Sequence, residues 1–414
     1  MLDIKYIRNN KGIVAKAIKD KACELNLDQL LDIDTQVSQT KTDLQKLQTL
    51  KNTIAKDVPR SEKAKRAELI EKGKKVGGQI KEMEPRLRRL EEKLQLMLYL
   101  VPNIPMATAP IGTCEDDNEV IRIVGLPPEF NFDLKNHREI VEQNQWAEFE
   151  RAVKVSGERA YTLKGELLLV EMALHNLALK KLAKRNFQIM SVVSFARDDA
   201  FLGTGHFPKG KDQVYHLEKE NQYLIGTSEI VTNSFHSGEI LKESELPIFY
   251  GAYGPCFRSE AGSSGRDVGG LMRVHQFNKT EQYILCKNDP AESEKWHQLM
   301  LEIAEELVCE LEIPYRVVEC CTGDMGVGKF RMNDIEVWVP SENRYRESHS
   351  GSTLHDWQAR RSGLRYRDGN GEVHFCHTLN CTAIATPRIL IPLMENHQRK
   401  DGSVCWPKKL KEML

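Results

Sequence analysis

The stretch that decides the fold of this chain runs from residue 257 to residue 283, FRSEAGSSGRDVGGLMRVHQFNKTEQY. It begins with Arg258 and Glu260 on either side of Ser259, and a glycine-rich, charged segment follows. The chain then returns through a run of alternating apolar and polar residues at 271–283. This pattern predicts a β-hairpin with a long loop.

The length and charge of that loop indicate a functional role. A loop of this size in a compact domain is usually either functional or disordered, and here charged side chains gather where the two strands would meet. We expect the hairpin to hold a nucleoside triphosphate, with Arg258 on phosphate, Glu260 on an amino group of the base and Phe277 as a stacking face. From the pattern alone, a Phe in an alternating strand is more often a core residue.

The composition is that of a globular protein with more than one domain. Its 414 residues suggest two or three domains. Apolar residues make up 40% and charged residues 29%, which allows a sizeable core. The net charge of −1 argues against bulk affinity for nucleic acid, although it averages over regions that differ.

Cysteine usage and the N-terminus point to a reducing, cytoplasmic compartment. The 10 cysteines contain no C-x-x-C pair, so we expect neither a zinc site nor a disulfide framework. The N-terminal MLDIKYIRNN has no apolar core of a signal peptide. No uncharged apolar run reaches about 18 residues, so we expect no transmembrane segment and no membrane partner.

The first hundred residues predict an antiparallel helical hairpin. Residues 26–57 lack Pro and Gly and carry a heptad repeat, Pro59 breaks it, and a second repeat covers residues 69–101. The first helix has two seam rows: Leu30, Val37, Leu44 and Lys51 in one, and Ile33, Thr40, Leu47 and Ile54 in the other. In the second helix they are Leu69, Val76, Met83, Leu90 and Met97 in one row, and Gly73, Ile80, Leu87, Leu94 and Val101 in the other. Gly77, Gly78 and Pro85 are weak points within this second helix.

This hairpin would project as an arm with a basic outer half. Residues 69–101 would span roughly 50 Å at about 1.5 Å per residue. Between residues 41 and 92 there are 15 Lys and Arg against 9 Asp and Glu. The excess fits either a solvated coiled-coil surface or a contact for a phosphate backbone. The proline-rich segment VPNIPMATAP (101–110) then forms a linker.

After about residue 112 the pattern becomes mixed α and β. Amphipathic helices are predicted at 166–184 and 289–312. Strand-like runs surround them: NQYLIGTSEIV, LMRVHQFNKTEQYIL, YRVVECC, NDIEVWVP and HTLNCTAIA. Helices segregated from hairpin-connected strands predict an α+β domain on a mostly antiparallel sheet. Neither G-x-G-x-x-G after a strand nor a P-loop is present, so Rossmann and P-loop folds are not favoured.

Five segments in order carry a family likeness. They are the N-terminal hairpin, YLIGTSE, FRSEAG…RVHQFNKTEQ, DIEVWVPSENRYRESHSGS and TLNCTAIATPRILIPLMENHQ. The chain resembles the seryl-tRNA synthetases, class II aminoacyl-tRNA synthetases of bacterial or organellar type. The resemblance implies a class II antiparallel sheet flanked by helices, with residues 1–103 as a tRNA-binding domain and 104–414 as the catalytic domain. Its motifs 1, 2 and 3 would lie at about 166–198, 255–283 and 377–398.

The resemblance also implies ligands for each part of the site. Catalytic cations that stabilise the transferring phosphate would be Arg258, Arg273 and Arg388. The ATP site would comprise Arg258, Ser259, Glu260, Val274, Phe277, Glu347, Ser348, His349, Ser350 and Arg388. The serine site would comprise Thr227, Ser228, Glu229, Arg258, Glu281, Asn380 and Thr382. By propensity alone, Thr382 fits a sheet face equally well.

A magnesium ion and several partners complete the expectation. Glu347 and Ser350 would ligate Mg²⁺ that bridges the ATP phosphates. His349 and His355 invite a metal interpretation, but no third His or Cys stands at ligand spacing. The implied partners are ATP, L-serine, serine tRNA and a second copy of the chain, with selenocysteine tRNA as a further substrate where an organism has it. Arg266, in the loop at 261–270, would contact phosphate at the tRNA acceptor end.

Two departures from the family pattern stand out, and two rival functions are kept. Val193 takes the place of the usual motif 1 proline, and Gly351 stands where many relatives carry Cys. One rival is a paralogue that activates an amino acid for a carrier protein. The other is a catalytically inactive RNA-binding regulator. The basic arm argues against the first, and the complete motifs argue against the second.

Overall fold

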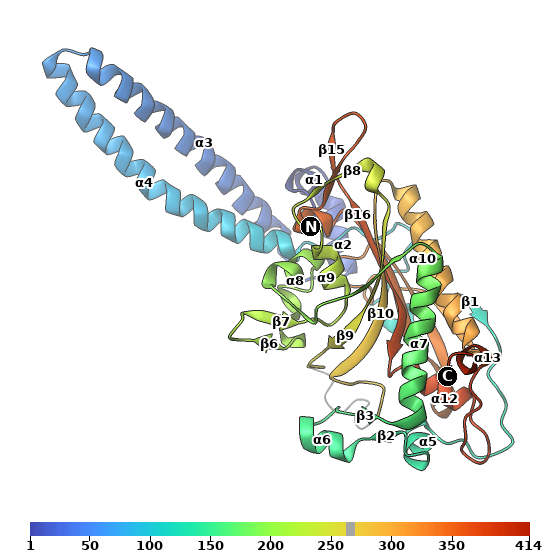
Figure 1. The fold of residues 1–414 in the computed structure, drawn as a ribbon. Helices are drawn as coiled ribbons and strands as arrows, with labels where there is room; N and C mark the ends of the chain where they lie inside the picture. The colour runs from blue at the N-terminus through green and yellow to red at the C-terminus, as the bar shows by residue number, and fades with distance from the viewer. Residues whose placement is uncertain (262–269) are drawn as a thin grey trace. The chain divides into compact units, whose positions relative to one another are not determined.

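The computed structural model describes residues 1–261 and 270–414 of the chain (Figure 1). The sequence prediction for Arg266 falls outside these residues. The described residues form two compact units. One consists of residues 2–19 and 23–101, and the other of residues 102–414 with Met1 and residues 20–22. Among the described residues, no helix is both long and apolar enough to cross a membrane.

The first unit is helical and confirms the predicted hairpin arm. Its elements are α1 (Ile4–Asn9), α2 (Lys11–Asp20), α3 (Leu27–Asp57), the 3₁₀ turn η1 (Val58–Arg60) and α4 (Lys63–Leu100). Figure 1 shows α3 and α4 running side by side in opposite directions. Asn26 caps α3 by accepting a hydrogen bond from the Gln29 N–H at 3.0 Å, and Pro59 lies in η1 where α3 ends.

The heptad seam packs α3 against α4. Leu44, Ile54, Val76 and Ile80 are buried together between the two helices. Gly73, the gap in one seam row, faces Ile54 closely enough that a Cβ there would stand 3.4 Å from its Cγ2. A Cβ at 73 would thus make an ordinary van der Waals contact with Ile54 across the seam. The helix α4 continues through Pro85, so this weak point does not divide it.

The second unit is built on an eight-stranded sheet that is mostly antiparallel, and a mostly antiparallel sheet was predicted. The order is β1 (Glu119–Val124), β11 (Tyr315–Glu319), β12 (Arg331–Val339), β13 (Arg344–His355), β16 (His377–Thr386), β10 (Gln276–Cys286), β9 (Ile248–Phe257) and β4 (Gln188–Ser191). Neighbours are antiparallel except β4, which runs parallel to β9. Strand β4 belongs to the predicted motif 1 region and forms one edge of the sheet.

Two long helices, α7 (Gly165–Lys184) and α10 (Pro290–Glu310), lie along the sheet (Figure 1). They contribute to the main apolar core together with β10 and β16. The shorter helices are α5 (His137–Gln143), α6 (Glu150–Ser156), α8 (Asp198–Thr204), α9 (Glu229–Ser234), α11 (Ala359–Ser362), α12 (Leu390–Asn396) and α13 (Lys408–Lys411). The 3₁₀ turns are η2 (Glu115–Asp117), η3 (Lys209–Gln213), η4 (Glu243–Glu245) and η5 (Pro340–Glu342). Small sheets pair β2 (Ala147–Glu148) with β3 (Thr162–Leu163), β5 (Phe195–Ala196) and β6 (His216–Leu217) with β7 (Gln222–Leu224), and β14 (Arg365–Arg367) with β8 (Ile240–Lys242) and β15 (Val373–Phe375).

The predicted hairpin exists, and its strands are shorter than the sequence pattern suggests. Strand β9 ends at Phe257, which pairs with Gln276 at the start of β10. Residues 271–275 were predicted as strand and are not, because their backbone groups find other partners. Leu271 donates to a histidine side chain, and the Met272 carbonyl accepts from an arginine.

A second prediction was wrong in part. The run NQYLIGTSEIV was expected to be a strand, but strand pairing ends near Ile225 and the TSEIV part begins α9. The Val231 N–H bonds the Ser228 carbonyl at 3.0 Å, which turns the backbone into a helix. Thr227 and Glu229 therefore lie at the start of α9 and not within a strand.

Candidate active site

Alternation along β10 separates a packing face from a polar face. Thr280 bonds His175 of α7 at 2.9 Å, and the Gln282 side chain donates to the Met300 carbonyl of α10 at 3.0 Å. Successive side chains of a strand point to opposite faces. Phe277 and Lys279 therefore face the other way, into a pocket with an empty volume of about 560 Å³.

The three predicted catalytic arginines all line this pocket. The Arg258 guanidinium lies over the Phe277 ring, 5.2 Å from its centroid. The Arg273 Nη1 donates to Glu260 Oε2 at 3.2 Å, and Arg388 Nη1 donates to Glu347 Oε2 at 3.4 Å. Three cations thus converge on one pocket, which suits a polyphosphate.

Most of the residues expected to bind the adenine base line the pocket next to the hairpin stem, by which we mean residues 258–260 and 271–277. Glu260, Val274 and Phe277 line it, and Glu260 has a left-handed backbone with φ of 52°. Ser259 is different, because its hydroxyl donates to the Asp212 carbonyl at 2.6 Å. Its observed role is to hold the backbone next to Glu260.

A buried charge pair forms the floor of the predicted serine site. Lys279 is ion-paired with Glu281 and also donates to the Thr227 hydroxyl at 3.2 Å. Glu281 is 1% exposed. Burial raises the pKa of Glu281, and the charge of Lys279 opposes that rise. Thr382 lines the pocket beside them.

A second buried carboxylate lies behind this floor. Glu229 Oε1 accepts hydrogen bonds from the Gln358 side chain at 2.7 Å and the Asn380 side chain at 2.8 Å. Burial alone would raise the pKa of Glu229, but nearby cations, Lys329 first, and the Gln358 bond keep the pKa below its ordinary value. Glu229 is therefore a fixed negative charge. Ser228 is fully buried between Thr227 and Glu229.

The predicted magnesium ligands lie on β13 beside a third carboxylate. Glu347 reaches the pocket rim, and Ser350 pairs with Asp334 of β12. Asp334 is 5% exposed, and its Oδ1 has no hydrogen-bond partner. Its pKa is raised well above the ordinary value, by burial first and then by the charge of Glu347. The ionised form of Asp334 is therefore disfavoured here, and a bound cation would favour it.

The neighbours of these residues on β13 have structural contacts. Ser348 lines the pocket and bonds His349 Nδ1 at 2.7 Å, while His349 Nε2 donates to the Ala383 carbonyl at 2.9 Å. Burial lowers the pKa of His349 to about 4, so the ring is neutral. His355 stacks on Phe330 with 3.9 Å between ring centroids.

Gly351 and Cys381 are paired across β13 and β16. A Cβ on residue 351 would lie 3.2 Å from the Cys381 sulfur. The thiol therefore occupies the space that a larger side chain at 351 would need. Glycine at 351 thus fits beside the Cys381 side chain.

Three side chains at the site were missed in the sequence. Lys279 stands two residues before Glu281, so strand alternation was a signal that could have found it. Gln358 reaches Glu229 from 129 residues away, for which the sequence carries no local signal. Arg346 lines an open groove that shares Arg273 and Arg388 with the pocket, and its position next to Glu347 was a usable signal.

Comparisons with known proteins identify the family to which the chain is related. The Seryl-tRNA synthetase N-terminal domain matches residues 1–105, and the tRNA synthetase class II core domain (G, H, P, S and T) matches residues 214–397. The Serine--tRNA ligase of Deinococcus radiodurans is 48% identical over 414 residues, covering 100% of this chain and 97% of the relative. The chain belongs to the seryl-tRNA synthetase family. Its resemblance to seryl-tRNA synthetases is thereby confirmed.

Solved structures of seryl-tRNA synthetases share the same fold. That of Pyrococcus horikoshii, complexed with ATP, superposes with a TM-score of 0.93 at 36% identity, covering 100% of this chain and 98% of that one. The cytoplasmic enzyme of Naegleria fowleri, in complex with AMP, has a TM-score of 0.87 at 28% identity, with 100% and 97% covered. The class II synthetase core and the N-terminal domain of the family are thus both present in this chain.

Proposed function

We propose that this chain ligates L-serine to serine tRNA through a seryl-adenylate formed from ATP. The observation that carries the proposal is the meeting of two groups of side chains in one region. Arg258, Arg273 and Arg388 surround a pocket for phosphates, and Lys279, which is ion-paired with the buried Glu281, lines the same pocket. Selenocysteine tRNA, which accepts serine in the same reaction, is a second proposed substrate.

In the first step a serine carboxylate oxygen attacks the α-phosphorus of ATP. A new P–O bond forms while the bond to the bridging oxygen breaks, and pyrophosphate leaves with the electron pair. The arginines stabilise the negative charge that spreads over the phosphoryl oxygens. No protein nucleophile is needed, because the side chains act by position and charge. In the second step the terminal ribose hydroxyl of the tRNA attacks the activated carbonyl, and AMP leaves.

The serine end selects its substrate by hydrogen bonds to a hydroxyl. Thr227 and Glu281 present buried oxygen acceptors, and Glu229 supplies a fixed negative charge for the substrate ammonium group. Alanine lacks the hydroxyl that would hydrogen-bond these oxygens, and losing a hydrogen bond at a buried site costs more than losing a methylene contact. Threonine would have to fit an extra methyl group beside Thr382 and Asn380.

Glu347 and Ser350 fit Mg²⁺ as ligands. Carboxylate and hydroxyl oxygens are the donors that Mg²⁺ prefers, and it keeps several waters. The unpartnered Asp334 Oδ1 and the raised pKa of Asp334 indicate a place where positive charge is favourable. When bound, the ion would neutralise charge on the ATP phosphates.

The helical arm is the proposed contact for tRNA. Its outer half, residues 41–92, has 15 basic against 9 acidic residues, which suits recognition of a phosphate backbone. The contact proposed for Arg266 with the acceptor end completes the tRNA interface. The reaction would take place in the cytoplasm, where the ten cysteines stay reduced.

We also propose that the chain forms a homodimer. Its interface would be an exposed apolar surface of the predicted motif 1 region. Leu169 and Met172 of α7 are 55% and 61% exposed, and Val193, after β4, is 56% exposed. Apolar side chains that gather on one face of a helix and an adjoining sheet edge mark an interaction surface. Val193 supplies such a side chain where relatives have proline.

Two assays test the proposal. Serine-dependent ATP–pyrophosphate exchange measures the first step, and charging of serine tRNA with radioactive serine measures the second. We expect both activities, with alanine and threonine inactive in exchange. Absence of exchange would support the inactive regulator instead, and exchange without charging would support the paralogue that loads a carrier protein.

A further inference from the structure

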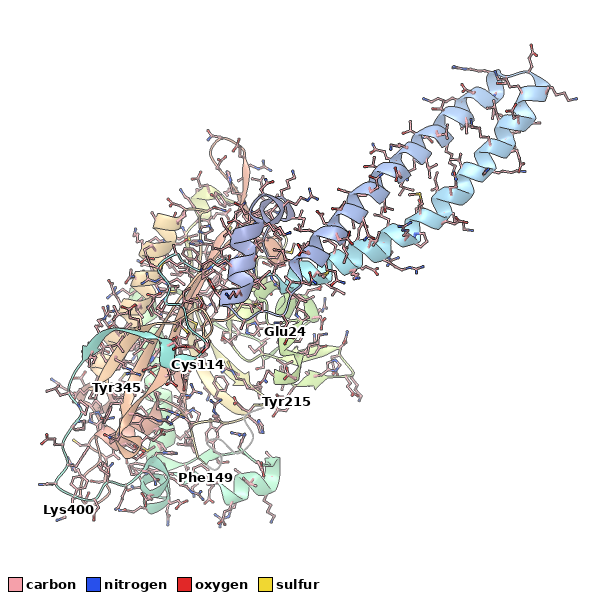
Figure 2. All side chains as sticks on the ribbon, turned by 180° about the vertical axis from the view of Figure 1, so that it is seen from behind. Glu24, Cys114, Phe149, Tyr215, Tyr345 and Lys400 are labelled. Carbon is pink, nitrogen blue, oxygen red and sulfur yellow. The ribbon has the colours of Figure 1, made fainter. Side chains whose placement is uncertain are left out.

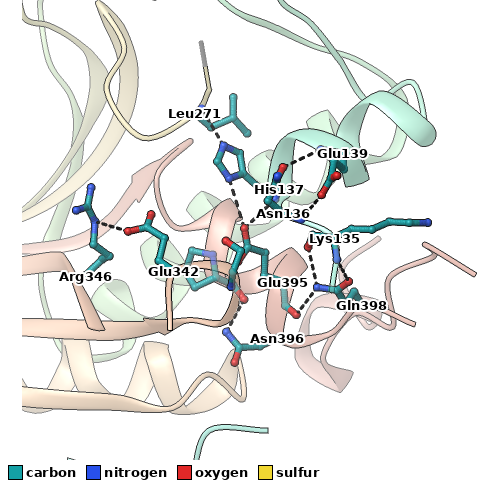
Figure 3. A network of polar contacts seen from close by, with 12 residues as sticks. Lys135, Asn136, His137, Glu139, Leu271, Glu342, Arg346, Glu395, Asn396 and Gln398 are labelled. Atoms are coloured by element: carbon teal, nitrogen blue, oxygen red, sulfur yellow. Dashed lines mark hydrogen bonds and ion pairs between the residues drawn. The ribbon is translucent and has the colours of Figure 1, made fainter. Parts of the chain in front are cut away.

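Glu395 is a fully buried carboxylate outside the pocket, and both of its oxygens are used (Figure 3). It lies in α12, the helix of motif 3. Its Oε1 accepts the backbone N–H of His137 at 2.7 Å, and its Oε2 accepts the backbone N–H of Ser341 at 3.0 Å. A buried carboxylate is costly unless it is hydrogen-bonded in this way. Glu395 therefore joins the starts of α5 and η5 to motif 3.

The side chain of His137 continues this network toward the hairpin stem. Its Nδ1 lies 3.4 Å from Glu395 Oε1, and its Nε2 accepts the backbone N–H of Leu271 at 3.4 Å (Figure 3). A carboxylate beside Nδ1 favours the tautomer that carries its proton there, which leaves Nε2 free to accept. Glu395 thus determines which atom of the imidazole faces the stem.

Gly270, the residue before Leu271, lies close to the same nitrogen of His137. A Cβ on residue 270 would stand 2.7 Å from His137 Nε2, a distance that requires the ring or the backbone to shift. The ring is held on its other side by Glu395, so it has little room to move. Glycine at 270 lets the stem approach the imidazole closely.

From Leu271 the contacts lead directly into the phosphate pocket. The residues from Leu271 to Val274 line that pocket, and the Met272 carbonyl accepts a hydrogen bond from Arg388 Nε at 3.4 Å. Arg388 stands two residues before the start of α12, the helix that carries Glu395. Motif 3 is therefore connected to the hairpin stem in two places. One connection runs from Glu395 through His137 to Leu271, and the other runs from Arg388 to Met272.

We propose that His137, oriented by Glu395, is a positioning residue for ATP. It sets the position of residues 271–274, and through them the position of Arg273 and Arg388. The proposal rests on the function proposed above, and it concerns the ATP end of the site alone. The serine end is held by other contacts, those of Lys279, Glu229 and Asn380.

The test compares two substitutions of His137 in pyrophosphate exchange. His137→Leu removes the acceptor for the Leu271 N–H, whereas His137→Gln keeps an amide oxygen near the place of Nε2 and an N–H for Glu395. We expect His137→Leu to raise the KM for ATP at least fivefold while the KM for serine changes less than twofold. His137→Gln should restore the KM for ATP to within twofold of the unmodified enzyme.

A matched control uses a second histidine–carboxylate pair in the same unit. His374 Nε2 lies 3.1 Å from Asp368 Oδ2 at the β14–β15 hairpin, away from the pocket. His374→Leu should leave both KM values unchanged. Equal changes in both KM values, or a His137→Gln enzyme no better than His137→Leu, would overturn the proposal, since either result indicates general disruption.

A second variant covers the case in which His137→Leu does not fold. Gly270→Ala pushes a methyl group toward Nε2 and should raise the KM for ATP at least threefold. In a His137→Ala background the same change should add less than twofold, because the ring is gone. Additive effects would contradict a shared contact. If the unmodified enzyme shows no exchange, the proposed function fails, and ATP affinities measured by calorimetry on the same variants still decide the role of His137.

Discussion

Lys279 shows how a single side chain can support a whole binding site. It satisfies the charge of Glu281 and the hydroxyl of Thr227 at once, from a strand whose other face is packed against helices. A buried carboxylate without such a partner takes up a proton or destabilises the fold. The ion pair therefore keeps Glu281 available as an acceptor for serine.

Lys279→Met should weaken serine binding selectively. Without the ammonium group, burial raises the pKa of Glu281 further, and a protonated carboxyl group carries no negative charge and accepts hydrogen bonds at fewer positions than a carboxylate. We expect the KM for serine in pyrophosphate exchange to rise at least tenfold, about 1.4 kcal/mol. Lys181→Met is the control, since Lys181 pairs with Glu306 and Glu310 outside the pocket. An unchanged KM for serine would contradict this role.

Arg258→Lys should be severe although the charge is kept. Lysine lacks the planar fork that binds two oxygens at once, and it stacks less well on Phe277. We expect the rate of pyrophosphate exchange to fall about 100-fold or more, as when a preorganised donor is lost. Arg360→Lys is a matched control, because Arg360 lies over Phe375 in the same manner at 4.6 Å but outside the pocket. An equal fall in the exchange rate of both variants would contradict a specific role for Arg258.

Many side chains that the motifs suggested line the candidate pocket, but the sequence did not predict their partners. Gln358 reaches Glu229 across 129 residues, and no local pattern indicates such a contact. Ser259 was expected at ATP, yet its hydroxyl bonds a backbone carbonyl of η3. These contacts join segments that are far apart in the sequence, so they depend on the tertiary fold and not on any local pattern.

At the scale of elements, prediction succeeded where periodicity is long. The heptad repeats of α3 and α4 extend over many turns and outweigh single residues such as Pro85. It was wrong over short segments. The TSEIV run was expected to continue the strand, but part of it forms the start of α9. Its backbone forms hydrogen bonds within the run, such as that from the Val231 N–H to the Ser228 carbonyl. Short runs take their structure from their surroundings.

The exposed face of α7 provides a prediction about assembly. Replacing both Leu169 and Met172 by lysine places two charges on the proposed interface without removing any buried side chain. We expect the mass in analytical ultracentrifugation to fall from that of a dimer to that of a monomer. Leu126→Lys, at a residue 87% exposed on the segment after β1, is the control and should leave the mass unchanged. A monomeric unmodified protein would contradict the proposal.

Across the molecule, the two units differ in how they hold polar groups. Most charged side chains of α3 and α4 are exposed, and Figure 2 shows side chains standing out along both helices, whereas the second unit buries several neutral histidines. His175 is the clearest, because its ring nitrogens bond Thr280 of β10 and Thr386 of β16, both at 2.9 Å, from the motif 1 helix α7. Burial lowers the pKa of His175 to about 3. The sequence gives no signal for this, since a histidine on an amphipathic helix is more often exposed.

The second unit should therefore lose stability in mild acid. The unfolded state binds a proton on His175 below a pH of about 6.5, but the folded state does not bind it until about pH 3. The stabilisation is thus complete above pH 6.5 and is lost as the pH falls toward 3, by about 1.4 kcal/mol per pH unit. His175→Gln keeps a donor and an acceptor for the two threonines but does not titrate. Between pH 7.5 and pH 5.5 its Tm should fall about 2 °C less than that of the unmodified protein, measured by differential scanning calorimetry. His216→Gln, at an exposed histidine of β6, should follow the unmodified protein, and an equal decrease in Tm for all three proteins would show that His175 is not responsible.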